Sequence, residues 1–454
     1  METHQEKTSP AGERKIFSQF FAALAGIFFG IALLKFGNPV ILDKLVEAPK
    51  GWLEILFQAW PVKWGYFMLT PVAITGLLSL RWKAEIPKWI LLLPLIWLGW
   101  QFLAAIQTVD ASLTTAALKH FSVCILFFYF GCFALRGGRK VWPLWVGLLI
   151  AFGLVLRAGF DQHFGGLEET RRFFYQQPGW QSYPPDFLKK ISSDRIFSTL
   201  FYPNTLAGAI LLLLPVCLVF IWHACAKLAA AVRDVFLVLF GVSALACLYW
   251  SGSKAGWLLA LISILVALAI ARIQLRWKIY IAVGLLVCGL AGFALKYAKF
   301  FERGSTSVVA RFDYWKAAVK IVRANPLLGT GPGTFSASYQ KIKNPNSEMA
   351  RLCHNDYLQQ ATDSGLIGAL AYAGFVLGSL VILFRRVWRN VDTIPFAVWL
   401  GLLGVSLHSF VEFHLYIPAL GWLVFFLFGW LWNLPAPTNP STNIKAESNL
   451  AAAR

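Results

Sequence analysis

The stretch Thr205–Trp222 reads TLAGAILLLLPVCLVFIW and contains no charged side chain. A continuous apolar run of about eighteen residues or more predicts a helix that crosses a lipid bilayer. Tyr202, Pro203 and Asn204 precede the run, and the next lysine or arginine after it is Lys227. The run therefore predicts a fold of membrane-spanning helices joined by polar connections.

The composition of the whole chain agrees with this fold. Of its 454 residues, 58% are hydrophobic and 14% are charged, whereas soluble domains have about 45–50% apolar and about 25% charged residues. These values exclude a soluble enzyme, a disordered chain and a small disulfide scaffold. The net charge of +19 is explained by basic loops, so we expect membrane lipids and no nucleic acid as partners. The cysteines form no CxxC pair, which argues against zinc and a disulfide framework.

Further apolar runs of roughly 17–22 residues, the length that crosses a bilayer, occur on both sides of the first. The first run of the chain lacks a clean cleavage site, which favours a retained helix over a signal peptide. Residues 39–60 look amphipathic and are expected at the membrane interface. The sequence predicts an all-α polytopic membrane protein of about twelve transmembrane helices, at 16–34, 64–80, 86–106, 115–135, 141–160, 205–222, 235–250, 255–271, 278–295, 365–384, 395–411 and 415–433.

Lysine and arginine mark alternate connections, which predicts the orientation. Short basic connections belong in the cytoplasm, and here they carry Arg14/Lys15, Arg81/Lys83/Lys88, Arg136/Arg139/Lys140, Lys227/Arg233, Arg272/Arg276/Lys278 and Arg385/Arg386/Arg389. Both termini are then cytoplasmic, and two long extracytoplasmic loops containing short helices lie outside. The predicted blocks are helices one to five (1–160), the first outer loop (161–204), helices six to nine (205–295), the large outer loop (296–364), helices ten to twelve (365–434) and a cytoplasmic tail (435–454).

The outer loops carry the polar residues of interest, because long connections of this kind are usually functional. The first loop ends in DRIFSTLFYPNT at residues 194–205, with Arg195 and Asn204 at the membrane edge. In the second loop, residues 310–323 predict a helix on which Lys316, Lys320 and Arg323 share one face. Arg311 falls on the opposite, apolar face with Trp315, where a cation is costly without a partner. An anion site at the membrane surface is favoured, and an intramolecular ion pair or a snorkelling arginine is the alternative.

Residues 353–360 (CHNDYLQQ) predict the start of another helix, interrupted at Gly365. On that helix His354 would share a face with Leu358 and Ala361 and point inward. The positive end of the helix dipole disfavours imidazolium, so a neutral His354 is a candidate general base. The alternative is a structural histidine with satisfied hydrogen bonds.

Three shorter motifs complete the outer face. Residues 251–256 (SGSKAG) carry Lys254, and residues 408–414 (HSFVEFH) carry His408 and Glu412. Ionisable side chains at the membrane edge are functional candidates, although exposure to water would make them ordinary. Residues 329–335 (GTGPGTF) are glycine-rich but follow no strand and lack the lysine of a P-loop, so they predict a tight turn.

In this order the motifs resemble the O-antigen ligase family, also called the O-antigen polymerase/ligase superfamily. The resemblance covers residues 195–370, and the hydropathy plan extends it to the whole chain. One position departs from the family pattern, because Lys254 stands where arginine is commoner and offers only a point charge. The motifs are the Arg195–Asn204 stretch, Ser251–Trp257 (SGSKAGW), Arg311-x-x-x-Trp315, Asn325–Phe335 (NPLLGTGPGTF), His354–Leu358 (HNDYL) and Gly365–Gly368 (GLIG).

The resemblance implies a glycosyltransferase that moves a glycan from an undecaprenyl-diphosphate carrier to an acceptor hydroxyl, on the outer side of the bacterial inner membrane. The acceptor would be lipid A core, another glycan or a protein. Arg195, Arg311 and Lys254 would bind the diphosphate and His354 would be the base. No D-x-D motif or carboxylate cluster occurs in the outer loops, so we expect an inverting transfer without metal or cofactor. Further candidates for the site are Asn355, Tyr357, Trp315, Asn204, Glu412 and His408.

Three other functions stay open. A polymerase that extends the lipid-linked chain and a protein O-oligosaccharyltransferase share the donor chemistry and differ only in the acceptor. A secondary transporter could use basic outer residues to bind an anion, but transporters usually show two matching halves with broken helices at the midplane. We find no convincing internal repeat in this sequence.

Overall fold

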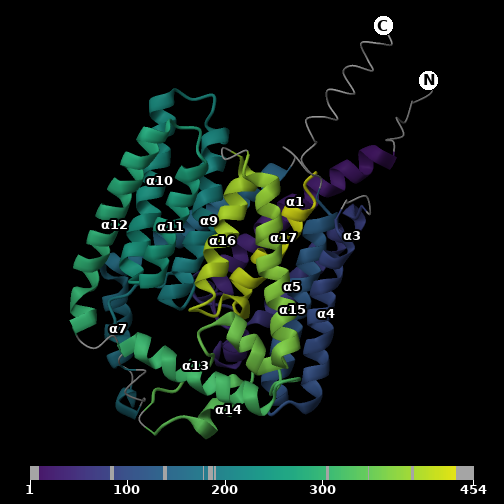
Figure 1. Ribbon diagram of the computed structural model, residues 1–454, viewed down its shortest axis with the longest axis vertical. Coiled ribbons are helices and arrows are strands. Elements are labelled where there is room, and N and C mark those ends of the chain that lie inside the picture. The colour runs from purple at the N-terminus through teal and green to yellow at the C-terminus, as the bar shows by residue number, and fades with distance from the viewer. Residues whose placement is uncertain are drawn as a thin grey trace.

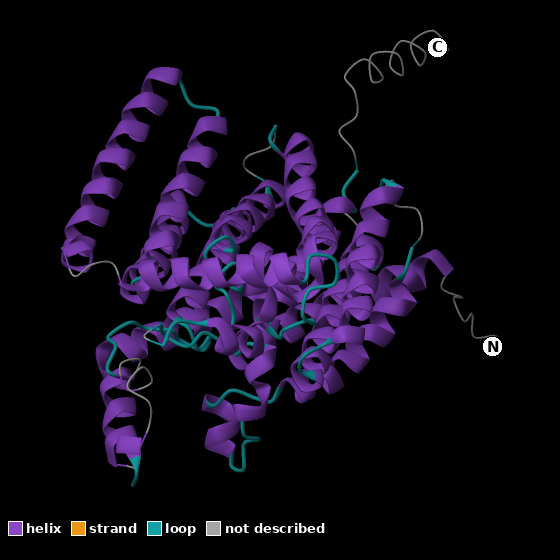
Figure 2. Cartoon of the chain, turned by 60° about the horizontal axis from the view of Figure 1, so that its bottom comes forward, coloured by secondary structure: helices purple, strands orange, loops and turns teal. Residues whose placement is uncertain are grey.

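The computed structural model of the protein describes residues 10–81, 86–135, 141–176, 178–182, 188, 191–302, 306–345, 347–389 and 393–435. Over this part of the chain the structure consists of helices and loops without strands (Figure 2). Several predicted features lie outside the described residues, namely Lys83, the basic group Arg136/Arg139/Lys140 and the tail from residue 436 onward.

Each of the twelve predicted runs overlaps one helix. Among the described residues, eight helices are long and apolar enough to cross a membrane and three apolar helices are shorter, while one further helix, Val62–Ser79, falls in neither group. The all-α polytopic class is therefore confirmed, while twelve crossings stay a prediction. The helices are α1 (Pro10–Lys35), α3 (Val62–Ser79), α4 (Lys88–Ala104), α5 (Ala111–Phe133), α6 (Trp142–Asp161), α9 (Pro203–Ala224), α10 (Ala230–Ser251), α11 (Lys254–Ile270), α12 (Leu275–Glu302), α15 (Asp356–Val387), α16 (Ile394–His408) and α17 (Pro418–Trp432).

Aromatic side chains form the core where α1, α5 and α17 meet. Phe29 of α1 lies 4.8 Å from the ring of Phe127 and 4.9 Å from that of Phe426, measured between centroids. Gly429 of α17 faces the backbone of α5 so closely that a Cβ atom there would lie 2.0 Å from the carbonyl oxygen of Phe128. Small residues allow membrane helices to approach in this way, so this glycine fixes the α5–α17 contact.

The predicted outer loops contain helices of their own. Residues 161–204 include α7 (Leu167–Gln176), which follows a π-helical turn at Gln162–Gly166, and a 3₁₀ turn at Trp180–Ser182. Residues 296–364 include α13 (Thr306–Ala324) and α14 (Phe335–Ile342). Figure 1 shows α7, α13 and α14 together at one end of the helix bundle. The amphipathic segment near the N-terminus forms a 3₁₀ helix (Val40–Leu45) and the short helix α2 (Trp52–Phe57).

Helix direction places the basic connections away from these outer helices. Arg195 contacts the end of α10 at Ser251, so α9 starts and α10 ends at the same side of the bundle. The turns between α9 and α10 and between α11 and α12 therefore lie at the opposite side (Figure 1). Lys227 lies in the first of these turns and Arg276 at the start of α12 beside the second, which agrees with a cytoplasmic assignment under the positive-inside rule.

The glycine-rich motif forms the tight turn that its sequence predicts. Gly329, Gly331 and Gly333 all have positive φ, at 65°, 104° and 76°, which glycine adopts without steric cost. The backbone N–H of Gly333 donates to the carboxylate of Asp363 at 2.7 Å. The predicted interruption at Gly365 is confirmed by a φ of 70° within α15. The turn therefore holds the end of α13 against the kink in α15.

Candidate functional site

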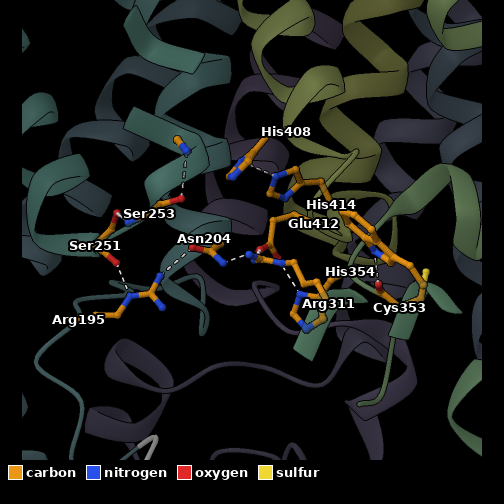
Figure 3. A network of polar contacts seen from close by, with 12 residues as sticks. Arg195, Asn204, Ser251, Ser253, Arg311, Cys353, His354, His408, Glu412 and His414 are labelled. Atoms are coloured by element: carbon orange, nitrogen blue, oxygen red, sulfur yellow. Dashed lines mark hydrogen bonds and ion pairs between the residues drawn. The ribbon is translucent and has the colours of Figure 1, made fainter. Parts of the chain in front are cut away.

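A continuous network of polar contacts joins residues that are far apart in the sequence (Figure 3). Its centre is Glu412, in the turn between α16 and the 3₁₀ helix His414–Tyr416, with a side chain that is only 3% exposed. One carboxylate oxygen accepts from Nη2 of Arg311 and from the side-chain amide of Asn204. The other lies 3.2 Å from Nδ1 of His354. The first loop, α13, the start of α15 and the last helix pair thus meet at one carboxylate.

Arg195 extends the network toward α10. Its Nε donates to the carbonyl oxygen of Ser251 at 2.7 Å, and its Nη2 donates to Oδ1 of Asn204 at 2.7 Å. Gly252 follows with a φ of 63°, and a Cβ atom at this position would lie 3.0 Å from Nε of Arg195. A glycine is required here both by the left-handed backbone and by the space that the guanidinium occupies. The first loop and the 251–256 turn therefore form one site, as the family motifs imply.

Arg311 points from α13 toward the bundle, and its charge is met within the protein. The side chain is 19% exposed and forms an ion pair with Glu412. Of the two interpretations of the apolar-face arginine, the intramolecular ion pair is thus present. The pairing does not use the whole guanidinium, because its Nε is buried without a hydrogen-bond partner among the described residues.

His354 lies before α15 and not within it. The helix begins at Asp356, Asn355 is its N-cap residue, and His354 has a left-handed φ of 52°. The prediction that His354 shares a helical face with Leu358 and Ala361 is therefore wrong. The left-handed backbone directs the imidazole toward Glu412, and the ring lies between Tyr314, at 5.8 Å, and Phe413, at 4.7 Å. The side chain remains 28% exposed, so solvent or a substrate can reach it.

The charged side chains of the site stabilise one another electrostatically. Burial by itself raises the pKa of Glu412, but Arg311 and His354 outweigh burial and hold this pKa well below its usual range. Burial lowers the pKa of Arg195 from its ordinary value, and the Glu412 carboxylate partly offsets this, so the guanidinium stays charged. Because an ionised carboxylate only accepts hydrogen bonds, Nδ1 of His354 is the donor in its contact with Glu412.

Two lysines line the same side of the site. The Nζ atom of Lys254 lies 5.0 Å from the ring centroid of Tyr297, and that of Lys296 lies 5.6 Å from the same ring. Lys296 also packs over Tyr249 at 3.2 Å. Lys296 was not among the residues predicted from the sequence. It stands at the end of an apolar run, as Lys254 stands at the start of one, and this position could have marked it as a candidate.

Other predicted residues support the site or lie apart from it. Trp315 donates from Nε1 to the carbonyl oxygen of Cys353 at 3.1 Å and so fixes the residue before His354. Asn355 caps α15 by accepting from the N–H of Leu358 at 3.0 Å, and Tyr357 donates to the carbonyl oxygen of Ser406 at 3.0 Å.

His408 belongs to a separate, fully buried contact. Its Nδ1 lies 2.9 Å from Nε2 of His414, and its side chain is shielded from solvent. Among the described residues no group of three or more His, Cys, Asp or Glu could hold a metal ion.

Comparison with known families agrees with the motifs. Residues 239–373 match the family model described as O-antigen ligase. The match runs from α10 into α15 and includes Lys254, Arg311 and His354, while Arg195 and Glu412 lie outside it. No curated protein matches the chain. The family model therefore confirms the resemblance to the O-antigen ligase superfamily over residues 239–373.

Proposed function

We propose that the protein transfers a glycan from an undecaprenyl-diphosphate carrier to an acceptor hydroxyl at the outer face of the bacterial inner membrane. The observation that supports this most is the Glu412 contact, which holds the imidazole of His354 and the guanidinium of Arg311 beside each other. A base and a phosphate-binding cation are the two groups that such a transfer needs within reach of one reacting bond.

The donor diphosphate would bind between Arg195 and Arg311. Arginine suits this role because its planar fork matches phosphate oxygens, and Nε of Arg311 is a buried donor that still lacks a partner among the described residues. As the bond between the anomeric carbon and the phosphate oxygen breaks, its electron pair leaves with the diphosphate. Cations fixed at that position stabilise the growing negative charge and lower the barrier. Lys254 and Lys296 add positive charge nearby.

The acceptor hydroxyl would be activated by His354. Its oxygen forms the new bond to the anomeric carbon while Nε2 of His354 takes the proton, and the histidine then releases that proton to water. Glu412 holds the imidazole in the required tautomer from the Nδ1 side and stabilises the imidazolium that forms, in the way that a buried carboxylate orients a catalytic histidine in other enzymes. A single displacement of this kind inverts the anomeric centre.

The proposed orientation follows from the same geometry. Arg195 and Glu412 lie at the bundle end that carries α13 and α14, whereas Lys227 and Arg276 lie at the other end (Figure 1). With the basic end in the cytoplasm, the site faces outward and both termini are cytoplasmic. A transporter is disfavoured because this polar network is built from loops, helix ends and the outer helix α13, whereas transporter sites are formed by helices that are broken near the midplane.

Analysis of surface glycans in a deletion strain tests the proposal and identifies the acceptor class. Accumulation of complete lipid-linked chains that are not attached to lipid A core indicates a ligase. Chains reduced to single repeat units indicate a polymerase, and loss of glycan from proteins alone indicates a protein O-oligosaccharyltransferase. Unchanged glycans together with lost uptake of a solute would contradict the proposal and indicate a transporter.

A further inference from the structure

We propose that the groove between α13 and α14 binds the acceptor, and that this acceptor is an anionic glycan carrying phosphate or carboxylate groups. The inference rests on the proposed function and deepens it by naming the acceptor's chemistry and its place. The groove is an open cavity of about 450 Å³, bordered by the outer face of α13 and by α14 with the loop that follows it. It lies at the bundle end that carries the outer helices (Figure 1).

Positive charge dominates the groove. Its described lining holds Lys316, Lys320, Arg323 and Lys343 but only one acidic residue, Asp313, whose carboxylate accepts from the hydroxyl of Ser347 at 3.0 Å. The three cations on α13 are exposed and form no ion pair with any described residue. Lys343 instead closes the rim, because its Nζ donates to backbone carbonyls, the nearest being that of Ser347 at 2.9 Å.

Aromatic rings supply the other half of a glycan site. Phe312 and Trp315 line the cavity, and the buried Tyr339 lies behind them. Phe312 is 51% exposed, which leaves much of its side chain open to a ligand. Flat apolar surfaces next to a few charged groups are the usual composition of a small-molecule or sugar site. A groove lined by cations alone would suit a small free anion. A groove lined by both cations and aromatic side chains suits a charged sugar chain.

Residues of α13 contact both the groove and the reaction centre. Trp315 lines the groove and bonds to Cys353, the residue before His354. Tyr314 contacts Tyr339 of the groove at 5.6 Å and stacks on His354 at 5.8 Å. Arg311, on the opposite face of the same helix, pairs with Glu412. One helix thus separates the donor cations from the groove cations. An acceptor held in the groove would extend past α13 and present its terminal sugar to His354.

Charge reversal in the groove tests the inference. The double variant Lys316→Glu/Lys320→Glu is compared with Lys341→Glu, an exposed lysine of α14 that does not line the cavity. The probes are lipopolysaccharide core and the same core after removal of its phosphates. Binding of fluorescently labelled core to the purified full-length protein and the KM for core during glycan transfer are both measured.

We expect the double variant to bind the phosphorylated core about tenfold more weakly or worse, with a matching rise in its KM and no change in the KM for the lipid-linked donor. Wild-type protein should bind the dephosphorylated core as weakly as the variant binds the native core, and Lys341→Glu should behave as wild type. Unchanged core affinity, or an equal rise in the donor KM, would overturn the groove assignment. Wild-type protein that binds core through these lysines but transfers no glycan would leave the groove standing and contradict the proposed function instead.

Discussion

Replacing Glu412 with glutamine removes the charge at the centre of the site while keeping the size of the side chain. The carboxylate is 3% exposed and pairs with Arg311, which is 19% exposed. Removing one partner of a buried ion pair costs roughly 3–5 kcal/mol, because the other charge is left uncompensated. Glutamine retains an oxygen that can accept from Arg311 and Asn204, so we expect a folded but destabilised protein near the lower end of that range.

The effect on turnover should exceed the effect on stability. An amide can donate to Nδ1 of His354, which would move the imidazole hydrogen to Nε2 and remove the acceptor that the proposed mechanism needs. A positioned base contributes about 10²–10⁴-fold to rate, which corresponds to about 3–5 kcal/mol of barrier. We therefore expect Glu412→Gln to lose activity by a factor within this range while still binding the lipid-linked donor.

The assay is transfer of extracted lipid-linked glycan to an acceptor by purified protein in detergent, with thermal unfolding measured on the same samples. Glu348→Gln serves as the matched control, because Glu348 is an exposed carboxylate of the same outer region. Wild-type turnover in folded Glu412→Gln protein would refute the reasoning. If turnover falls only in proportion to the amount of folded protein, Glu412 has a structural role and no role in catalysis.

Three further predictions follow from the same network. Reporter fusions at Arg276 and Arg389 should give a cytoplasmic signal and those at Gly179 and Asn344 an outside signal; an outside signal at Arg276 would place the site on two sides of the membrane. Arg311→Lys keeps the pair with Glu412 but loses the planar fork, so we expect near-normal stability and at least about tenfold weaker donor use, judged by the donor KM, with Arg311→Ala worse in both. Because the pKa of Glu412 is lowered in the folded protein, its stabilisation is complete above the ordinary glutamate pKa of about 4.3 and is lost as the pH falls toward the lowered value. The difference in unfolding temperature between wild type and Glu412→Gln should therefore shrink between pH 6 and pH 3, and a constant difference would contradict the ion-pair assignment.

The helices could be predicted because their signal is local. A bilayer requires long apolar runs, and every predicted run overlaps a helix. The apolar face of α13 could be predicted for the same reason, since helical periodicity placed Arg311 beside Trp315. Its partner could not, because Glu412 lies 101 residues further along the chain and no spacing rule links the two.

The start of α15 was predicted wrongly for a different reason. The imidazole of His354 was placed on a helical face, whereas the Asn355 side chain that follows it caps the helix. Asparagine directly before an acidic residue is a common N-cap pattern, so the sequence did contain the signal that His354 stands outside the helix. The left-handed φ of His354 could not be foreseen, because it is stabilised by tertiary contacts with Tyr314, Phe413 and Glu412.

The central claim is that His354 activates the acceptor during transfer of a lipid-linked glycan. The most direct test reconstitutes wild-type protein and His354→Ala in liposomes with undecaprenyl-diphosphate-linked glycan and acceptor. Product formation is followed across pH 5 to 8, roughly the range in which imidazole titrates. His223→Ala, an exposed histidine at the far end of α9, serves as the control. We predict that wild type and the control transfer glycan, whereas His354→Ala folds and binds donor but loses about 10²–10⁴-fold in turnover, together with the acidic limb of its pH–rate profile. Folded His354→Ala with wild-type turnover and an unchanged acidic limb would contradict the account.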